Sequence, residues 1–189
     1  MPPPERQLPP PVSIGRAWET SEGEPADAQA AIAEAGQNLA ALLALEPHMV
    51  TAAQAQTLAE ALKPVVDTEP FSEPRQLAMV RLYARAGEMK HAELACRLVL
   101  QRNLDSLPCL HLLADICEVK GQHRDGILAS HRILRLDPKD APAAWRLARF
   151  YRIIGLERDV DIWSRKAVQL YHEMGHHAIA DQVQSTTSP

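Results

Sequence analysis

Apolar residues recur at spacings of three and four along most of the chain beyond residue 72. Leu77, Val80 and Tyr83 form the first such series, and Ala92 and Cys96 belong to the second. Similar series follow within residues 110–117, 127–134, 147–151 and 160–170. This spacing gathers apolar side chains on one face of an α-helix, whereas a half-buried strand alternates at every second residue. The pattern therefore predicts an all-α protein in which each helix buries one face.

Three kinds of residue recur at an interval of 34 positions. They are glycines (Gly87, Gly121, Gly155), prolines (Pro74, Pro108, Pro142) and small polar residues (Ser72, Ser106, Asp140). Ser and Asp side chains accept hydrogen bonds from the first amides of a helix, and proline fits the first helical turn. Glycine readily adopts the left-handed conformation that ends a helix. The interval therefore predicts repeated units, each made of a helix, a tight turn and a second helix.

The repeated unit resembles the tetratricopeptide family, whose pattern is W-x2-L-G-x2-Y, then A-x3-F, then P. The resemblance covers residues 73–106, 107–140 and 141–174. The matching residues are Leu113 and Leu147, the small Ala114 and Ala148 that follow them, Tyr83, Tyr151, Ala92 and Pro138. The departures are Gln76 and Ala144 for Trp, Gly126 and Val160 for Ala, and Leu104 and His172 for the closing Pro. The resemblance implies an all-α helical-repeat solenoid with a concave groove lined by the first helix of each unit.

The expected solenoid comprises residues 71–185, with three helix-turn-helix units and a C-terminal capping helix at residues 175–185. In the capping helix, Ile179 and Val183 are four residues apart, so we expect both to face the core. The last residues, 186–189, are expected to form a disordered tail.

The N-terminal part of the chain differs in composition from the repeats. Six prolines within residues 1–24 predict a disordered arm, because such a segment buries too little apolar surface to offset its ordering entropy. Residues 25–70 are expected to form an N-terminal helical hairpin. Thr51 is the expected N-cap of its second helix, and Pro64 and Pro70 are expected to break the chain beyond it.

The charge of the chain argues against nucleic acid as its main partner. The formal net charge is −4. Residues 1–70 carry 10 acidic and 3 basic residues, a balance of −7, whereas residues 71–189 carry 14 and 17, a balance of +3. No apolar run approaches the roughly 20 residues of a membrane-spanning helix. We therefore expect no nucleic-acid binding and no membrane insertion.

The three cysteines, Cys96, Cys109 and Cys117, contain no C-x-x-C pair. Neither a disulfide framework nor a zinc knot is indicated, so we expect small buried thiols in a reducing, cytoplasmic environment. No glycine-rich phosphate loop or nucleophile elbow occurs, and we expect no cofactor.

The family resemblance also implies which residues line the groove. They are Arg81 and Arg85 in the first unit, His111 and Asp115 in the second, and Trp145, Arg146, Arg149 and Arg152 in the third. The three arginines of the third unit recur every three residues beside a tryptophan, which favours an acidic or carboxylate-ended partner segment. A solvated charged surface and internal ion pairs are the alternative interpretations of this series.

Residues 172–176 read His-Glu-Met-Gly-His, the H-E-x-x-H motif of zinc proteases. That motif requires both histidines on one helix face, with the glutamate as general base. The repeat frame places Gly175 in a turn, so we expect that His172 and His176 do not share a helix and that no metal is held. Adventitious metal binding by His172, His176 and His177 stays open.

These features favour a non-catalytic protein-interaction module that acts as an adaptor, an assembly factor or a chaperone-like binder. A dedicated secretion-type chaperone is a close variant, because some translocator chaperones are similar in plan. A structural subunit of a larger complex is the second class, and a zinc metalloprotease is a remote third. The partner, its pathway and the oligomeric state are left open.

Overall fold

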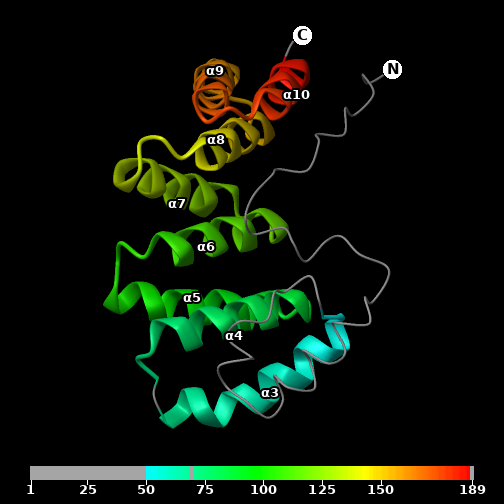
Figure 1. Cartoon of the computed structure of the whole chain (residues 1–189), viewed down its shortest axis with the longest axis vertical. Coiled ribbons are helices and arrows are strands. Elements are labelled where there is room, and N and C mark those ends of the chain that lie inside the picture. The colour runs from blue at the N-terminus through cyan, green and yellow to red at the C-terminus, as the bar shows by residue number, and fades with distance from the viewer. Residues whose placement is uncertain (1–49, 69, 188–189) are drawn as a thin grey trace. The chain divides into compact units, whose positions relative to one another are not determined.

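The computed structural model describes residues 50–68 and 70–187, and in these residues the chain folds into eight helices without a strand (Figure 1). The expected Pro-rich arm at residues 1–24 and the first helix of the expected hairpin lie outside the described residues. By its internal contacts the chain divides at Gln122. We call residues 50–122 the N-terminal unit and residues 123–187 the C-terminal unit.

The N-terminal unit contains four helices that pack in chain order. They are α3 (Ala52–Thr68), α4 (Glu73–Arg85), α5 (Met89–Arg102) and α6 (Leu107–Val119). Helix α4 contacts α3, α5 and α6, so it lies at the centre of the unit. One core joins Leu58 and Leu62 of α3 to Met79 of α4, and a second joins Val80 of α4 to Ile116 of α6.

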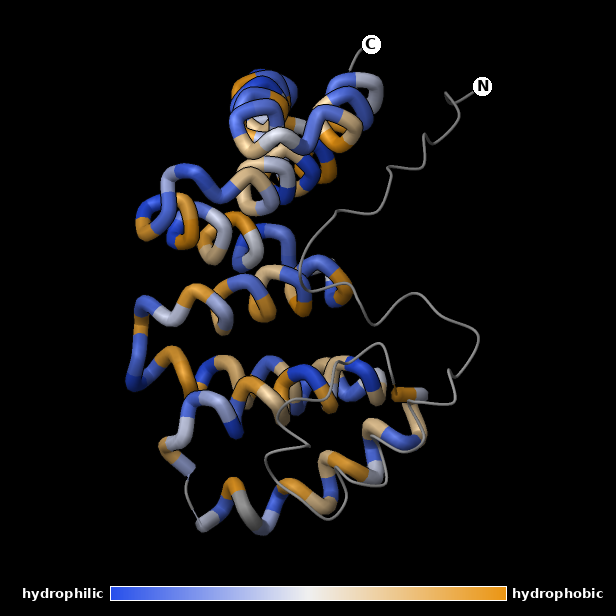
Figure 2. Tube along the Cα trace, in the orientation of Figure 1, coloured by the Kyte–Doolittle hydropathy of each residue, from blue (hydrophilic) through white to orange (hydrophobic). Residues whose placement is uncertain are grey.

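The C-terminal unit contains α7 (His123–Leu136), α8 (Ala141–Ile153), α9 (Glu157–Glu173) and α10 (His177–Thr187). Helix α8 packs against α7 and α9, and α9 packs against α10. Hydrophobic and hydrophilic residues alternate around the turns of the helices in both units, as expected for helices that bury one face (Figure 2).

The residues at the helix ends of the repeats have their predicted roles, except that the side chain of Ser72 makes no capping hydrogen bond at the start of α4. Ser106 Oγ accepts a hydrogen bond from Cys109 N at 3.3 Å, and Asp140 Oδ1 accepts one from Ala143 N at 2.7 Å. Helices α4, α6 and α8 each carry a proline in the first turn. Gly87, Gly121 and Gly155 have φ values of 81°, 71° and 78°, so each ends a first helix in the left-handed conformation.

The expectation that Pro64 ends its helix is wrong. Thr51 begins α3 with a capping box, in which Gln54 N donates to Thr51 Oγ1 at 3.4 Å and Thr51 N donates to Gln54 Oε1 at 2.8 Å. The helix then continues through Pro64 to Thr68. Val66, beyond the proline, is buried in the same core as the preceding leucines, and this packing offsets the amide hydrogen bond that proline lacks.

The capping helix forms as α10, with two differences from its expected details. Its buried residues are Ala180 and Val183, while Ile179 is half-buried. The helix also continues to Thr187, so residues 186–187 do not belong to a disordered tail. Arg152 of α8 donates to the Thr186 carbonyl oxygen at 2.9 Å and holds this last turn against α8.

Candidate functional site

The predicted groove residues of the N-terminal unit come from α4 and α6, two helices that are in contact. Arg81, Arg85 and His111 are half-buried, and Asp115 is buried. Arg85 Nε donates to the Val50 carbonyl oxygen at 2.5 Å, which ties α4 to the residue that precedes α3. Arg81 and His111 therefore retain partial exposure for a partner, whereas Arg85 has a contact within the fold.

The predicted groove residues of the C-terminal unit all lie on α8, where burial differs from the expectation. Trp145 is 3% exposed, Arg146 1% and Arg149 7%. Arg152 is half-buried and bonded to α10. The physical reason is the central position of α8 between α7 and α9, which leaves nine of its thirteen residues buried. The role of these four residues in binding stays a proposal.

Arg146 acts electrostatically inside the C-terminal unit. Burial is the largest influence on Tyr171 of α9 and raises the pKa of its hydroxyl to about 12. Asp140 reinforces this rise, and the positive charge of Arg146 opposes it. The guanidinium of Arg146 therefore lies within electrostatic reach of α9, in accordance with its burial.

The H-E-x-x-H motif does not form the geometry of a zinc protease. Helix α9 ends at Glu173, and Gly175 has a φ of 79°, so His176 lies in the turn before α10. His172 instead pairs with His177, with their Nδ1 atoms 2.9 Å apart. Among residues 50–68 and 70–187, no group of three His, Cys, Asp or Glu side chains is placed to hold a metal ion.

The three cysteines are fully buried, as expected. The Cys109 thiol donates to the Cys96 carbonyl oxygen at 3.3 Å. The thiol of Cys96 has a raised pKa because of its hydrogen bond with Cys109 and because of burial. A buried thiol with a raised pKa is a poor nucleophile, which applies here to Cys96.

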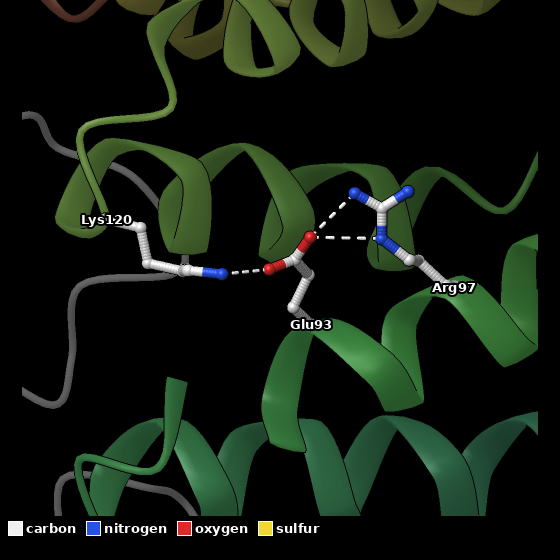
Figure 3. Close-up of polar contacts among 3 residues, drawn as sticks. All are labelled: Glu93, Arg97 and Lys120. Atoms are coloured by element: carbon white, nitrogen blue, oxygen red, sulfur yellow. Dashed lines mark hydrogen bonds and ion pairs between the residues drawn. The ribbon is translucent and has the colours of Figure 1, made fainter. Parts of the chain in front are cut away.

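An ion-pair cluster that the sequence analysis did not identify joins α5 to the end of α6 (Figure 3). Glu93 Oε1 accepts from Arg97 Nη2 at 2.6 Å and from Arg97 Nε at 3.0 Å, while Glu93 Oε2 pairs with Lys120 Nζ. The hydrogen bond from Lys120 is the largest influence on the pKa of Glu93, and it lowers that pKa. The spacing of four residues between Glu93 and Arg97 on one helix could have predicted their ion pair, but no local spacing indicates the pair with Lys120.

The second helices expose a large aliphatic side chain at the same repeat position. Leu94 on α5 is 57% exposed, Leu128 on α7 is 68% exposed and Ile162 on α9 is 55% exposed. These residues are 34 positions apart, the interval of the glycines and prolines. Single exposed aliphatic residues are ordinary, and here such residues recur at one position of all three repeats. The repeat interval was the signal that would have found them.

Solved structures share this arrangement of helices. MamA from Desulfovibrio magneticus RS-1, residues 41 to the end, superposes with a TM-score of 0.61 at 13% identity, over 87% of this chain and 95% of that chain. TTC0263, a thermophilic TPR protein in Thermus thermophilus, superposes with a TM-score of 0.51 at 14% identity, over 85% and 89%. The chain has the fold of tetratricopeptide repeat proteins. No protein-family model matches the sequence, and no curated protein matches it either.

The tetratricopeptide repeat fold accounts for the positions of the candidate residues. The predicted groove residues lie on the first helices, α4, α6 and α8, and the exposed aliphatic residues lie on the second helices, α5, α7 and α9. Across the part of the chain that the structure describes, no helix has the length and apolar content to cross a lipid bilayer.

Proposed function

We propose that this protein is a non-catalytic protein-interaction module that acts in the cytoplasm as an adaptor, an assembly factor or a chaperone-like binder. The observation that carries the proposal is the recurrence of exposed aliphatic side chains at Leu94, Leu128 and Ile162. An aliphatic side chain that is exposed in each repeat gives each of the three repeats an apolar contact point. The interruption of the H-E-x-x-H motif at Gly175 supports a role without catalysis.

The first helices supply the second part of the proposed contact surface. Arg81 and His111 of the N-terminal unit are half-buried, and we assign them to the partly exposed part of that surface. Arg85 and Arg152 are half-buried as well, but each donates a hydrogen bond within its own unit. Asp115, Trp145, Arg146 and Arg149 are buried, and we assign them the role of holding α6 and α8 in shape. A partner with an acidic segment matches the arginines of this set.

A structural subunit of a permanent complex is the second candidate function, and the same exposed aliphatic residues favour it. Permanent interfaces are larger and more apolar than transient ones. Size-exclusion chromatography of the isolated full chain separates the two functions. An adaptor elutes as a defined monomer or small oligomer, whereas an obligate subunit aggregates without its partners.

Affinity capture tests the interaction function directly. The tagged full chain is used as bait in an extract of its native cell, and captured proteins are identified by mass spectrometry. A triple variant with Leu94→Asp, Leu128→Asp and Ile162→Asp is the control, because all three changes fall on exposed positions. We expect one or a few proteins to be captured by the wild type and lost from the triple variant. Capture of the same proteins by both baits would contradict the proposal.

A further inference from the structure

An open surface cavity of about 520 Å³, lined largely by exposed residues, lies in the C-terminal unit between α9 and the turn that joins α7 to α8. Its apolar lining comes from Pro138, Ile162 and Leu170, and its basic lining comes from Lys139, Arg165 and Lys166. We call it the α9 cavity. Its volume lies within the range of roughly 300–1,000 Å³ that is usual for ligand sites. It includes Ile162, one of the recurring exposed aliphatic residues.

The α9 cavity has an excess of positive charge. Three cations face one carboxylate, Glu173, which accepts a hydrogen bond from Gln169 Nε2 at 2.8 Å. Within residues 50–68 and 70–187, Lys139, Arg165 and Lys166 form no ion pair. Lys166 Nζ lies 5.7 Å from the centre of the Trp163 ring, and that contact leaves its charge uncompensated.

The same place in the first repeat lacks this charge. A smaller cavity of about 200 Å³ lies there in the N-terminal unit, lined by Phe71 and Leu98 at the positions of Lys139 and Lys166. Arg97, at the position of Arg165, is paired with Glu93. Arg102 lies over the Phe71 ring, with its Cζ atom 3.1 Å from the ring centre. The basic character of this place in the third repeat is therefore absent from the first repeat.

We propose that the α9 cavity binds an acidic segment of a partner protein, with one aliphatic side chain of that segment packed against Ile162 and carboxylates on Lys139 and Arg165. The inference rests on the proposed interaction function and specifies the chemistry of the partner. Guanidinium groups pair with carboxylates in two parallel hydrogen bonds, which favours a peptide acid over a diffuse negative surface. A few residues supply most of the affinity in such interfaces, and arginine is among the residue types that are enriched there.

The test selects a random peptide library displayed on phage against the immobilised full chain. Selected peptides are then synthesised and titrated against variants. The double variant Lys139→Glu with Arg165→Glu reverses charge at two exposed residues, and Lys139→Arg with Arg165→Lys retains it. Ile162→Asp removes the apolar contact. Leu104→Asp is the matched control, because Leu104 is 56% exposed, close to the 55% of Ile162, and lies in the turn between α5 and α6, outside the proposed contact residues.

We expect the selected peptides to share an aliphatic residue flanked by Asp or Glu. Their affinity should fall at least about tenfold in the charge-reversed variant and in Ile162→Asp, and should stay within about twofold in Leu104→Asp. The charge-retaining variant should lose less affinity than the charge-reversed variant, because lysine keeps the charge of Arg165 but not its paired hydrogen bonds. Affinity should also weaken as salt rises from about 0.05 M to about 0.5 M. Peptides without carboxylates, equal loss in Leu104→Asp, or failure to select any peptide would overturn the inference.

Two further outcomes separate the inference from the proposed function. Self-association of the chain that Ile162→Asp abolishes would make a second copy the occupant and would overturn the choice of a partner protein. If affinity capture yields a protein that the charge-reversed variant retains fully, the interaction function stands and the α9 cavity is excluded as its site. If the triple variant captures the same proteins as the wild type, the proposed function fails whatever the peptide selection shows.

Discussion

Glu93 is a carboxylate of the N-terminal unit that pairs with two cations. It is largely buried between Arg97 on its own helix and Lys120 at the end of α6. The hydrogen bond from Lys120 is the main cause that holds the pKa of Glu93 below its ordinary value of 4.5, and burial acts in the opposite direction. A carboxylate with a lowered pKa stabilises the fold above the pKa that it has in the unfolded chain, and that contribution is lost as pH falls.

Glu93→Gln should therefore change the pH dependence of stability. We expect the variant to melt at a lower temperature than the wild type near neutral pH. The difference should shrink as the pH falls from about 6 to about 3, because the wild-type carboxylate becomes protonated through its lowered pKa. Melting curves by circular dichroism across this range measure it. A difference in melting temperature that stays constant with pH would show that Glu93 stabilises the fold by its packing and not by its charge.

Position 126 of α7 requires glycine because of the neighbouring Phe150 side chain, and not because of its backbone conformation. A Cβ atom at this position would lie 2.3 Å from Cζ and 2.6 Å from Cε2 of Phe150, a fully buried residue of α8. The family pattern has Ala at this position, and the Phe150 ring occupies the space that the methyl group would need. The pairing gives a physical reason for this departure from the family pattern.

Gly126→Ala should lower the free energy of unfolding by about 1–3 kcal/mol, although alanine is the better helix former by about 1 kcal/mol. Urea denaturation of the full chain measures the change. The same substitution in a Phe150→Leu background is the control, because the shorter side chain vacates the position of Cζ and should remove most of the penalty. A Gly126→Ala variant that is as stable as the wild type would contradict the close packing of α7 on α8.

Helix α10 packs against α9, the second helix of the third repeat. Ala180 and Val183 are buried, while Gln182 between them is exposed. Helix α10 covers apolar residues of α9, as neighbouring helices of a repeat array do for one another. The contacts of α10 with α9 and the hydrogen bond from Arg152 to Thr186 fix this helix at the end of the C-terminal unit.

Val183→Asp should destabilise the chain by about 2–4 kcal/mol, because it places an unpaired carboxylate in an apolar contact. Gln182→Asp is the matched control, with the same new charge one position away on the exposed side. We expect its stability to stay within about 0.5 kcal/mol of the wild type. Thermal melting measures both. Equal melting temperatures for the two variants would mean that α10 does not cap the unit.

At the scale of elements, the repeat units were largely predictable because each end carries its own local signal. Ser106, Asp140 and Gly155 perform the roles that their residue types favour. Helix α3 was not predictable through Pro64, because the packing of Val66 that offsets the proline is a tertiary effect. The end of α10 was missed for the same reason, since its last turn is held by Arg152 from another helix.

At the scale of the whole molecule, the fold was predictable and the candidate site was only partly so. The interval of 34 defined the helices, but the resemblance assigned groove positions without the burial of each side chain. In the sequence, Trp145, Arg146 and Arg149 resemble a binding set, because the sequence does not show whether a side chain is buried or exposed. Their burial follows from the packing of α8 between α7 and α9, which the spacing of residues on α8 alone does not report.

Arg149 and Arg81 make the clearest test of how the groove residues divide between folding and binding. Both lie on first helices, but Arg149 is buried and Arg81 is half-buried. Truncating a buried arginine removes its packing and its charge from the interior. Where this breaks a buried ion pair, the free energy of unfolding falls by roughly 3–5 kcal/mol. We expect Arg149→Ala to lower the melting temperature markedly and Arg81→Ala to leave it nearly unchanged.

The affinity for the captured partner supplies the second readout. For Arg81→Ala we expect weaker binding, with less dependence on salt than in the wild type, because one partly exposed charge has been removed without loss of fold. For Arg149→Ala we expect binding to fall only in proportion to the unfolded fraction. If Arg149→Ala instead retains its melting temperature and loses affinity about tenfold or more, the arginine contacts the partner directly. That result would return the centre of the site to α8, since a side chain that holds the fold cannot be removed without loss of stability.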